Sequence, residues 1–279
     1  MSSVEIWSGK DRGDENFPVG SALIRKALRP HVHAYYAFAR NADDIADSPD
    51  LAAEDKVARL DRMEAVLLGH EIDGSPSAAR LRDSLAETGV DAAHATELLI
   101  AFRQDATKRR YADWGELLHY CRYSAAPVGR YMLELHGEEP ATWAASDALC
   151  TSLQVLNHLQ DGSKDLAVLD RCYLPQDMLD AAGADVADLA GAAETPGLRR
   201  ATSRLLDLVD GLNDTASQLP RLTRDRRLRL EVAVIVRLAE RLTARLRRGD
   251  PVGTRVKLTK TDVAQSVARS LASAIRWAA

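Results

Sequence analysis

The sequence lacks the features that would assign it to several common protein classes. Its only cysteines are Cys121, Cys150 and Cys172, and their spacing matches neither a metal site nor a redox motif. We therefore expect free thiols in a reducing, cytoplasmic setting. The formal net charge is −4, and this small acidic excess gives no indication of a nucleic-acid partner, which would require a basic face.

Long apolar runs are absent as well. A membrane-spanning helix needs roughly 20 apolar residues, but the best local run, residues 232–236, is bounded by Glu231 and Arg237. No apolar stretch follows the polar start Met1–Glu5, so we expect no signal peptide. Nevertheless, 46 % of the residues are hydrophobic, which is enough for a sizeable core.

What the chain does contain is helix-period hydrophobic patterning, with Ala, Leu and Arg prominent. We expect Pro30 to interrupt the first helix, Pro127 to kink a later one, and Thr142 to act as an N-cap. The region Asp73–Pro76 has turn chemistry. Helices are predicted over residues 51–68, 92–106, 114–135, 143–165, 198–219, 226–247 and 261–277. No linker or repeat divides the chain, so a single all-α domain over residues 1–279 is expected.

An acidic motif ends the first predicted helix. Asp43 and Asp47 are four residues apart, so they share one helical face, with Arg40 one turn before Asp43. Two like charges at this spacing repel each other, which makes sense if a cation lies between them. Mg2+ prefers oxygen ligands and often shares its shell with substrate phosphates. A solvated acidic helix end is the alternative interpretation.

A second polar stripe lies about a hundred residues later. Gln154, Asn157, Asp161 and Asp165 step by three, four and four residues along one helix. A polar stripe next to core-facing leucines is costly to bury unless ligands satisfy it. We expect the two acidic helices to face each other across a cavity and to hold metal ions with a diphosphate between them.

These motifs identify a resemblance to the squalene and phytoene synthase family, the all-helical prenyl synthases. The matching patterns are Tyr36-x-x-x-Arg40-x-x-Asp43-x-x-x-Asp47 and Gln154-x-x-Asn157-x-x-Gln160-Asp161-x-x-x-Asp165, followed by Tyr173-Leu174-Pro175. The resemblance extends from about Asn16 to the region of Arg255. Segments 15–19 and 124–130 are similar to the bacterial hydroxysqualene synthases of hopanoid pathways. The resemblance implies an isoprenoid synthase fold, a helical bundle around a central cavity.

The resemblance also implies roles for individual residues. Mg2+ would be held by Asp43, Asp47, Asn157, Asp161 and Asp165. Tyr36 would stabilise a carbocation, Asn16 would contact the diphosphate, and Gln154 would bind substrate. Arg40 would grip diphosphate oxygens, unless it only forms a salt bridge along its helix. The expected reaction is the conversion of presqualene diphosphate to hydroxysqualene with release of diphosphate.

Departures from the family pattern keep alternatives open. Gln160 stands where many head-to-head synthases have Arg, which favours an enzyme that ionises one preformed diphosphate. Ala126 stands where related hydroxysqualene synthases tend to have Asn, so the group that positions the capturing water is open. Condensation of two farnesyl diphosphates to presqualene diphosphate, squalene or dehydrosqualene is the nearest alternative function. A non-catalytic helical scaffold is the alternative from another class.

The expected partners are a prenyl diphosphate and other enzymes of squalene synthesis. Because substrate and product would both be lipids, we expect transient docking at the inner membrane face. A basic patch, Arg221, Arg224, Arg226, Arg227 and Arg229, is interpreted as a solvated helix face in preference to a lipid head-group contact or a partner surface. Arg255, Lys257 and Lys260 receive the same interpretation.

Overall fold

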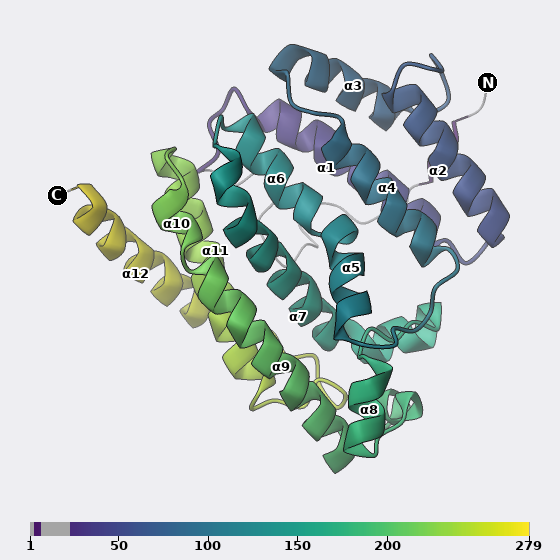
Figure 1. Cartoon of the computed structure of the whole chain (residues 1–279), viewed down its shortest axis with the longest axis vertical. Helices are drawn as coiled ribbons and strands as arrows, with labels where there is room; N and C mark the ends of the chain where they lie inside the picture. The colour runs from purple at the N-terminus through teal and green to yellow at the C-terminus, as the bar shows by residue number, and fades with distance from the viewer. Residues whose placement is uncertain (1–2, 7–22, 279) are drawn as a thin grey trace. The chain divides into compact units, whose positions relative to one another are not determined.

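The computed structural model describes residues 3–6 and 23–278, and this part of the chain contains helices and no strand. Side chains are described up to residue 274. The all-α prediction is confirmed. The chain divides into two compact units, whose helices are labelled in Figure 1. Unit 1 comprises the described residues up to 108 together with 123–139, and unit 2 comprises 109–122 and the described residues from 140 onward.

Unit 1 is built around α1 (Arg29–Asp47), which packs against α2 (Ala53–Leu67), α3 (Pro76–Thr88) and α4 (Ala93–Asp105). Helix α6 (Ala126–Leu135) packs on α4. Phe38 and Ile45 of α1 are fully buried in the core of this unit. They are seven residues apart and share one helical face, so Asp43 and Asp47 lie on roughly the opposite face. The core contacts of α1 therefore turn its acidic motif away from the core.

Unit 2 has α7 (Trp143–Leu169) at its centre, packed against α9 (Pro196–Ala216) and α11 (Arg226–Leu246). Val155, Leu156 and Leu159 of α7 are buried. Helix α12 (Lys260–Ala278) packs on α11. The remaining elements are most of α5 (Trp114–Ser124), η1 (Pro140–Thr142), α8 (Gln176–Ala182), η2 (Val186–Ala190) and α10 (Leu219–Leu222).

Several details of the helix prediction were wrong, mainly at prolines. Pro30 lies in the first turn of α1 and does not interrupt the helix, and Pro127 begins α6. Proline fits the first turn, where its missing N–H leaves no helical bond unmade. The predicted kinked helix 114–135 is therefore two helices, α5 and α6. Thr142 precedes α7, but its side chain makes no capping hydrogen bond.

None of the helices that the structure describes is long and apolar enough to cross a membrane. Cys121, Cys150 and Cys172 form no disulfide.

Candidate active site

The first acidic motif presents its predicted residues on one face of α1. Tyr36, Arg40, Asp43 and Asp47 follow one another at intervals of four, three and four residues. All four side chains are partly exposed, whereas Val32, Tyr35, Phe38 and Ala42 on the other side of the helix are buried. The sequence prediction of a shared face is therefore consistent with the helix that the chain forms.

Arg40 pairs with carboxylates of its own helix. Its Nη1 lies 2.9 Å from Oδ2 of Asp43, and its Nε donates to Oδ1 of Asp44 at 3.0 Å. The side chain of Asp44 is only 1 % exposed, compared with 35 % for Asp43. Asp44 is the buried counter-charge of Arg40. The salt bridge along the helix, which was the alternative interpretation of Arg40, is present, but its buried partner Asp44 lies outside the pair Asp43 and Asp47.

The Asp43 carboxyl lies in an environment that disfavours its charge. Burial raises its pKa to about 7, the negative charge of Asp47 adds to the effect, and Arg40 opposes it. Asp105, a buried residue at the end of α4, also raises this pKa. Asp105 escaped sequence analysis because it lies far along the chain and belongs to no acidic repeat. The carboxylates of Asp47, Asp105 and Asp44 therefore all raise the pKa of Asp43, and a bound cation would relieve this repulsion.

The two adjacent tyrosines of α1, Tyr35 and Tyr36, differ in burial. Tyr35 is buried, stacks on Tyr131 with ring centroids 3.9 Å apart, and donates to the carbonyl of His94. Tyr36 is only partly buried. Tyr35 therefore packs in the core, whereas Tyr36 does not have this role. That Tyr36 stabilises a carbocation stays a prediction. Asn16 lies outside the described residues.

The second motif lies on the face of α7 away from its buried leucines. Gln154, Asn157, Asp161 and Asp165 are all partly exposed, as expected for one stripe. Gln154 also contacts the next turn, with its Nε2 3.1 Å from Nε2 of His158. The structure does not test whether Gln154 and Asn157 bind substrate.

His158 was not predicted, and it joins α7 to an aromatic cluster. Its ring stacks on Tyr173 with centroids 3.4 Å apart, and Tyr111 and Tyr120 complete the cluster. Burial and, to a smaller extent, the positive charge of Arg171 together lower the pKa of His158 to about 3. The ring is therefore neutral at physiological pH and acts as a packing group.

A loop after α11 contacts the second motif at two consecutive residues. Nη2 of Arg255 lies 2.9 Å from Oδ2 of Asp161, and Nε2 of Gln160 donates to the carbonyl of Val256 at 2.5 Å. Gln160 is buried, and its Oε1 has no hydrogen-bond partner. Arg255 is 42 % exposed, so it is solvated as interpreted from the sequence, and it is also paired with Asp161. This arginine places a guanidinium beside Asp161, in a motif that has Gln at position 160.

The sequence of this loop explains why it is held in place. The carboxylate of Asp250 accepts backbone N–H groups of Val252, Gly253 and Glu194, and these bonds, that of Gly253 foremost, lower its pKa. At the other end, Asp262 accepts from the backbone N–H of Thr259 and from Arg245. Arg255 lies between these two anchors, so its position does not depend on its exposed ion pair alone.

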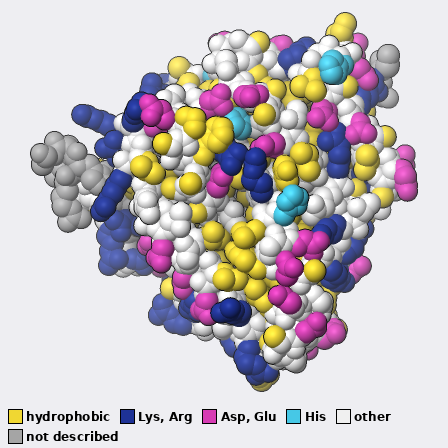
Figure 2. Space-filling model, in the orientation of Figure 1, with side chains coloured by type: hydrophobic (Ala, Val, Ile, Leu, Met, Phe, Trp, Pro, Cys, Tyr) yellow, Lys and Arg dark blue, Asp and Glu magenta, His cyan; other side chains and the backbone are white. Residues whose placement is uncertain are grey.

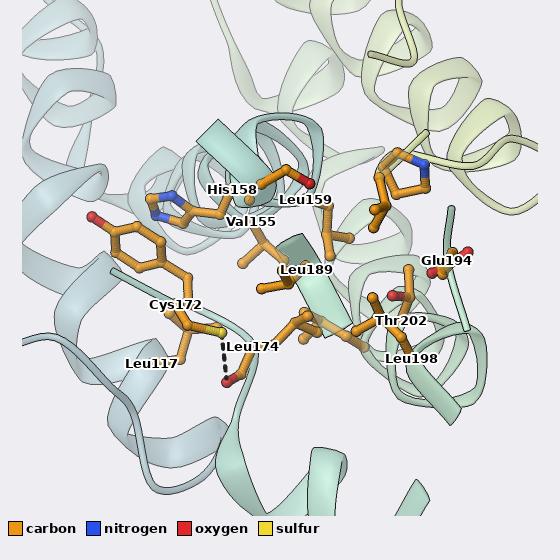
Figure 3. A pocket seen from close by; sticks show the side chains of 16 residues that line it. Leu117, Val155, His158, Leu159, Cys172, Leu174, Leu189, Glu194, Leu198 and Thr202 are labelled. Carbon is orange, nitrogen blue, oxygen red and sulfur yellow. Dashed lines mark hydrogen bonds between the residues drawn. The ribbon is translucent and has the colours of Figure 1, made fainter. Parts of the chain in front are cut away.

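A small cavity lies behind the second motif and is distinct from its polar stripe. It measures about 20 Å³ and is lined by Val155, His158, Leu159 and Ser163 of α7 together with mostly apolar residues of other elements (Figure 3). A void of this size holds about one water molecule. It cannot hold an isoprenoid chain, so it is a packing defect and not a substrate pocket.

The donor chemistry of both motifs fits a hard divalent ion. Asp43 and Asp47 offer carboxylate oxygens on α1, and Asn157, Asp161 and Asp165 offer carboxylate and amide oxygens on α7. Within the described chain, no group of three or more His, Cys, Asp and Glu side chains could by itself hold a metal ion. A divalent ion at either motif would therefore need further ligands, such as diphosphate or water oxygens, to complete its shell.

Comparison with known proteins identifies close relatives. Residues 10–262 match the family model for squalene/phytoene synthases. Hydroxysqualene synthase of Rhodopseudomonas palustris is 49 % identical over 92 % of this chain and 88 % of its own length. The corresponding enzyme of Zymomonas mobilis is 42 % identical over 94 % of this chain and 89 % of its own.

Solved structures agree with this match. The crystal structure of squalene synthase HpnC from Alicyclobacillus acidocaldarius aligns with a TM-score of 0.74 at 34 % identity, covering 85 % of this chain and 90 % of that one. A dehydrosqualene synthase aligns with a TM-score of 0.79 at 20 % identity, covering 93 % and 92 % of the two chains. The second similarity is evidence for the fold alone.

Proposed function

Because this chain belongs to the squalene/phytoene synthase family, we propose that it converts presqualene diphosphate to hydroxysqualene and releases diphosphate, within squalene and hopanoid biosynthesis. The observation that carries this proposal is the 49 % identity to a hydroxysqualene synthase over 92 % of the chain. Both acidic motifs are intact in the sequence and present oxygen donors on partly exposed helix faces. The protein is thus an isoprenoid synthase with all-helical architecture.

Enzymes of this family generally use a divalent metal, and here we propose Mg2+. The ion would be held by Asp43 and Asp47 on α1 and by Asn157, Asp161 and Asp165 on α7. When bound, it neutralises charge that develops on the departing diphosphate. The raised pKa of Asp43 supports a cation at the first motif, because a positive charge would offset the repulsion between Asp43 and Asp47.

The other predicted residues act on the organic substrate. The side chain of Arg40 is 14 % exposed, and its guanidinium donates to diphosphate oxygens while Asp44 holds it in position. Gln154 and Asn157 orient the diphosphate from α7, and Asn16 contacts it. The partly exposed ring of Tyr36 stabilises the carbocation that forms when the diphosphate leaves. Water then captures the rearranged cation to give the alcohol.

We assign the protein to the cytoplasm, with peripheral contact at the inner membrane face. The chemical argument is that both the proposed substrate and the proposed product are lipids. Enzymes that supply presqualene diphosphate or consume hydroxysqualene are its proposed pathway partners, and no nucleic acid is involved.

Product analysis tests the proposed reaction. The pure protein is incubated with Mg2+ and presqualene diphosphate in one reaction, and with farnesyl diphosphate alone in another, and the products are identified by mass spectrometry. We expect hydroxysqualene from the first substrate and no turnover of the second. Turnover of farnesyl diphosphate but not of presqualene diphosphate would replace the proposal with a condensing synthase. No turnover of either by folded protein would favour the scaffold alternative.

A further inference from the structure

Helix α12 has the reverse of the usual burial pattern. Its polar residues Asp262, Ser266, Ser270 and Ser273 are buried, while its apolar residues Val263, Val267 and Leu271 are 42 %, 38 % and 47 % exposed. A helix that covers a soluble core places its apolar residues inward. On α12 the apolar residues lie on the more exposed side of the helix instead.

The reversed orientation is fixed by contacts along the helix. Near its start, Asp262 accepts hydrogen bonds from Arg241 and Arg245 of α11. About three turns later along α12, Arg237 of α11 donates to Oγ of Ser273. Burial favours the protonated form of Asp262, but the bonds from Arg245 and Thr259 hold its pKa below the usual value. Rotating α12 to bury its valines would break these anchors and leave a carboxylate without its arginines.

The exposed residues form a continuous stripe. Val263, Val267 and Leu271 recur every four residues, and the exposed Ala264 and Ala268 widen the stripe on one side. The serines lie on the opposite side, where their small side chains let α12 approach α11 closely. Ser266 and Ser270 make no hydrogen bond through Oγ. The inward face is therefore a close-packing surface, and the outward face is an apolar surface that the described residues leave partly exposed.

The surroundings of the stripe are strongly basic. Residues 219–279 contain fifteen Lys and Arg against five Asp and Glu, in a chain whose formal net charge is −4. Figure 2 shows Lys and Arg side chains gathered along the edge of the molecule where Figure 1 draws α10 to α12. Beside the start of α12, a groove of about 490 Å³ is lined by Arg241, Arg245, Arg248 and Lys257, with Asp262 as its one acidic residue. An anionic surface would complement this charge.

We propose that α12 docks this protein on an anionic lipid bilayer, with Val263, Val267 and Leu271 entering the interface and the surrounding Lys and Arg contacting phosphate head groups. An apolar stripe next to cationic residues on a helix without a spanning length is the pattern of an interfacial helix. Anionic lipids attract such basic segments over a short range. The inference rests on the proposed function, since a lipid substrate and a lipid product give the enzyme a reason to work at a bilayer.

Charge argues against a second copy as the occupant. In a symmetric dimer through α12, the same basic region of each copy would face the other, and the like charges would repel. A nucleic acid would match the charge, but it would leave the valines and Leu271 without a role. Only a surface that is both anionic and apolar uses every feature of this face.

Vesicle flotation tests the proposal. The full-length protein is mixed with phosphatidylcholine vesicles with and without phosphatidylglycerol. We expect binding only to the anionic vesicles, and release as salt rises from about 0.1 M to about 1 M, over which the screening length falls from about 10 Å to about 3 Å. The double variant Val267→Ser with Leu271→Ser should reduce partitioning about tenfold or more. Ile72→Ser is the matched control, because Ile72 is 82 % exposed in unit 1.

Further variants separate this inference from the proposed reaction. Lys257→Gln with Lys260→Gln should weaken binding to anionic vesicles, and Asp161→Asn should leave it unchanged. Circular dichroism and thermal unfolding check that each variant is folded. Failure of the wild-type protein to bind anionic vesicles, or equal binding by the Val267/Leu271 variant, would overturn the proposal. Self-association in sedimentation that this double variant abolishes, without vesicle binding, would assign the stripe to a second copy.

Discussion

The two acidic motifs obtain their positive charge in different ways. On α1, Arg40 belongs to the same helix as its partners Asp43 and Asp44. On α7, the cation beside Asp161 is Arg255, which arrives from a loop 94 residues away. The first pair follows from helix geometry alone, whereas the second needs the tertiary fold. The pair of Arg40 with Asp44 is buried, whereas the pair of Arg255 with Asp161 is exposed. This difference in burial predicts measurable differences in stability.

The largest expected difference concerns stability. Arg40→Gln should destabilise unit 1 by about 3–5 kcal/mol, because it leaves the buried carboxylate of Asp44 without its cation. Arg255→Gln should cost about 0–1 kcal/mol, because Arg255 is 42 % and Asp161 is 23 % exposed. Urea unfolding of the metal-free variants measures both values. Equal losses in the free energy of unfolding for Arg40→Gln and Arg255→Gln would show that the difference in burial does not determine the stability of these ion pairs.

A second difference concerns pH. The pKa of His158 is lowered from 6.5 to about 3 in the folded protein. The contribution of neutral His158 to the free energy of unfolding is therefore complete above pH 6.5 and decreases as the pH falls below 6.5. The pKa of Asp43 is raised from 3.8 to about 7 in the folded protein. The contribution of protonated Asp43 to the free energy of unfolding is therefore complete below pH 3.8 and is lost as the pH rises through 7. The metal-free α1 and α7 regions should therefore respond to pH in opposite directions.

Hydrogen exchange resolved to α1 and α7 measures this effect. Between pH 6.5 and 5.5, α7 should lose about 1 kcal/mol of protection free energy. The change at α1 should be a smaller gain, since the Asp43 side chain is 35 % exposed to screening solvent. His158→Phe and Asp43→Asn should each flatten the response of their own helix only. If the protection of α1 and α7 changed with pH in the same direction, and if neither variant altered this change, His158 and Asp43 would not be its cause.

The smallest effect is expected at Gln160. Gln160→Ala removes the hydrogen bond to the carbonyl of Val256 and should reduce stability by about 1 kcal/mol. Amides of residues 254–257 should exchange faster, while those of α1 remain unchanged. Gln176→Ala is a suitable control, because Gln176 makes an exposed hydrogen bond to Asp180 four residues away. Unchanged exchange in the loop would mean that Asp250 and Asp262 hold it without Gln160.

The sequence predicted those parts of the fold that depend on a regular pattern along a single helix. Long helices such as α7 and α11 were identified from their apolar period. Helix α3 was missed because Pro76 was assigned to a turn, although it begins that helix. The 7 residues of α8 are too few to establish a period. Pro127 was expected to bend a helix, but the chain separates there into α5 and α6.

The same limit applies to the site. The shared face of Tyr36, Arg40, Asp43 and Asp47 follows from spacing along one helix. Asp105 beside Asp43, Arg255 beside Asp161 and the stacking of His158 on Tyr173 involve residues from separate elements, and no periodic pattern marks them. The outward apolar face of α12 was likewise hidden, because its sequence period is that of an ordinary amphipathic helix and only burial shows which face is covered.

The most direct test of the central claim is turnover of presqualene diphosphate by Asp43→Asn and Asp161→Asn, measured with saturating Mg2+ and substrate. Because each carboxylate is proposed to hold Mg2+ that would neutralise charge on the departing diphosphate, each variant should lose about a hundredfold or more in rate while remaining folded. Wild-type turnover by either folded variant would contradict the assignment of both motifs to one reaction.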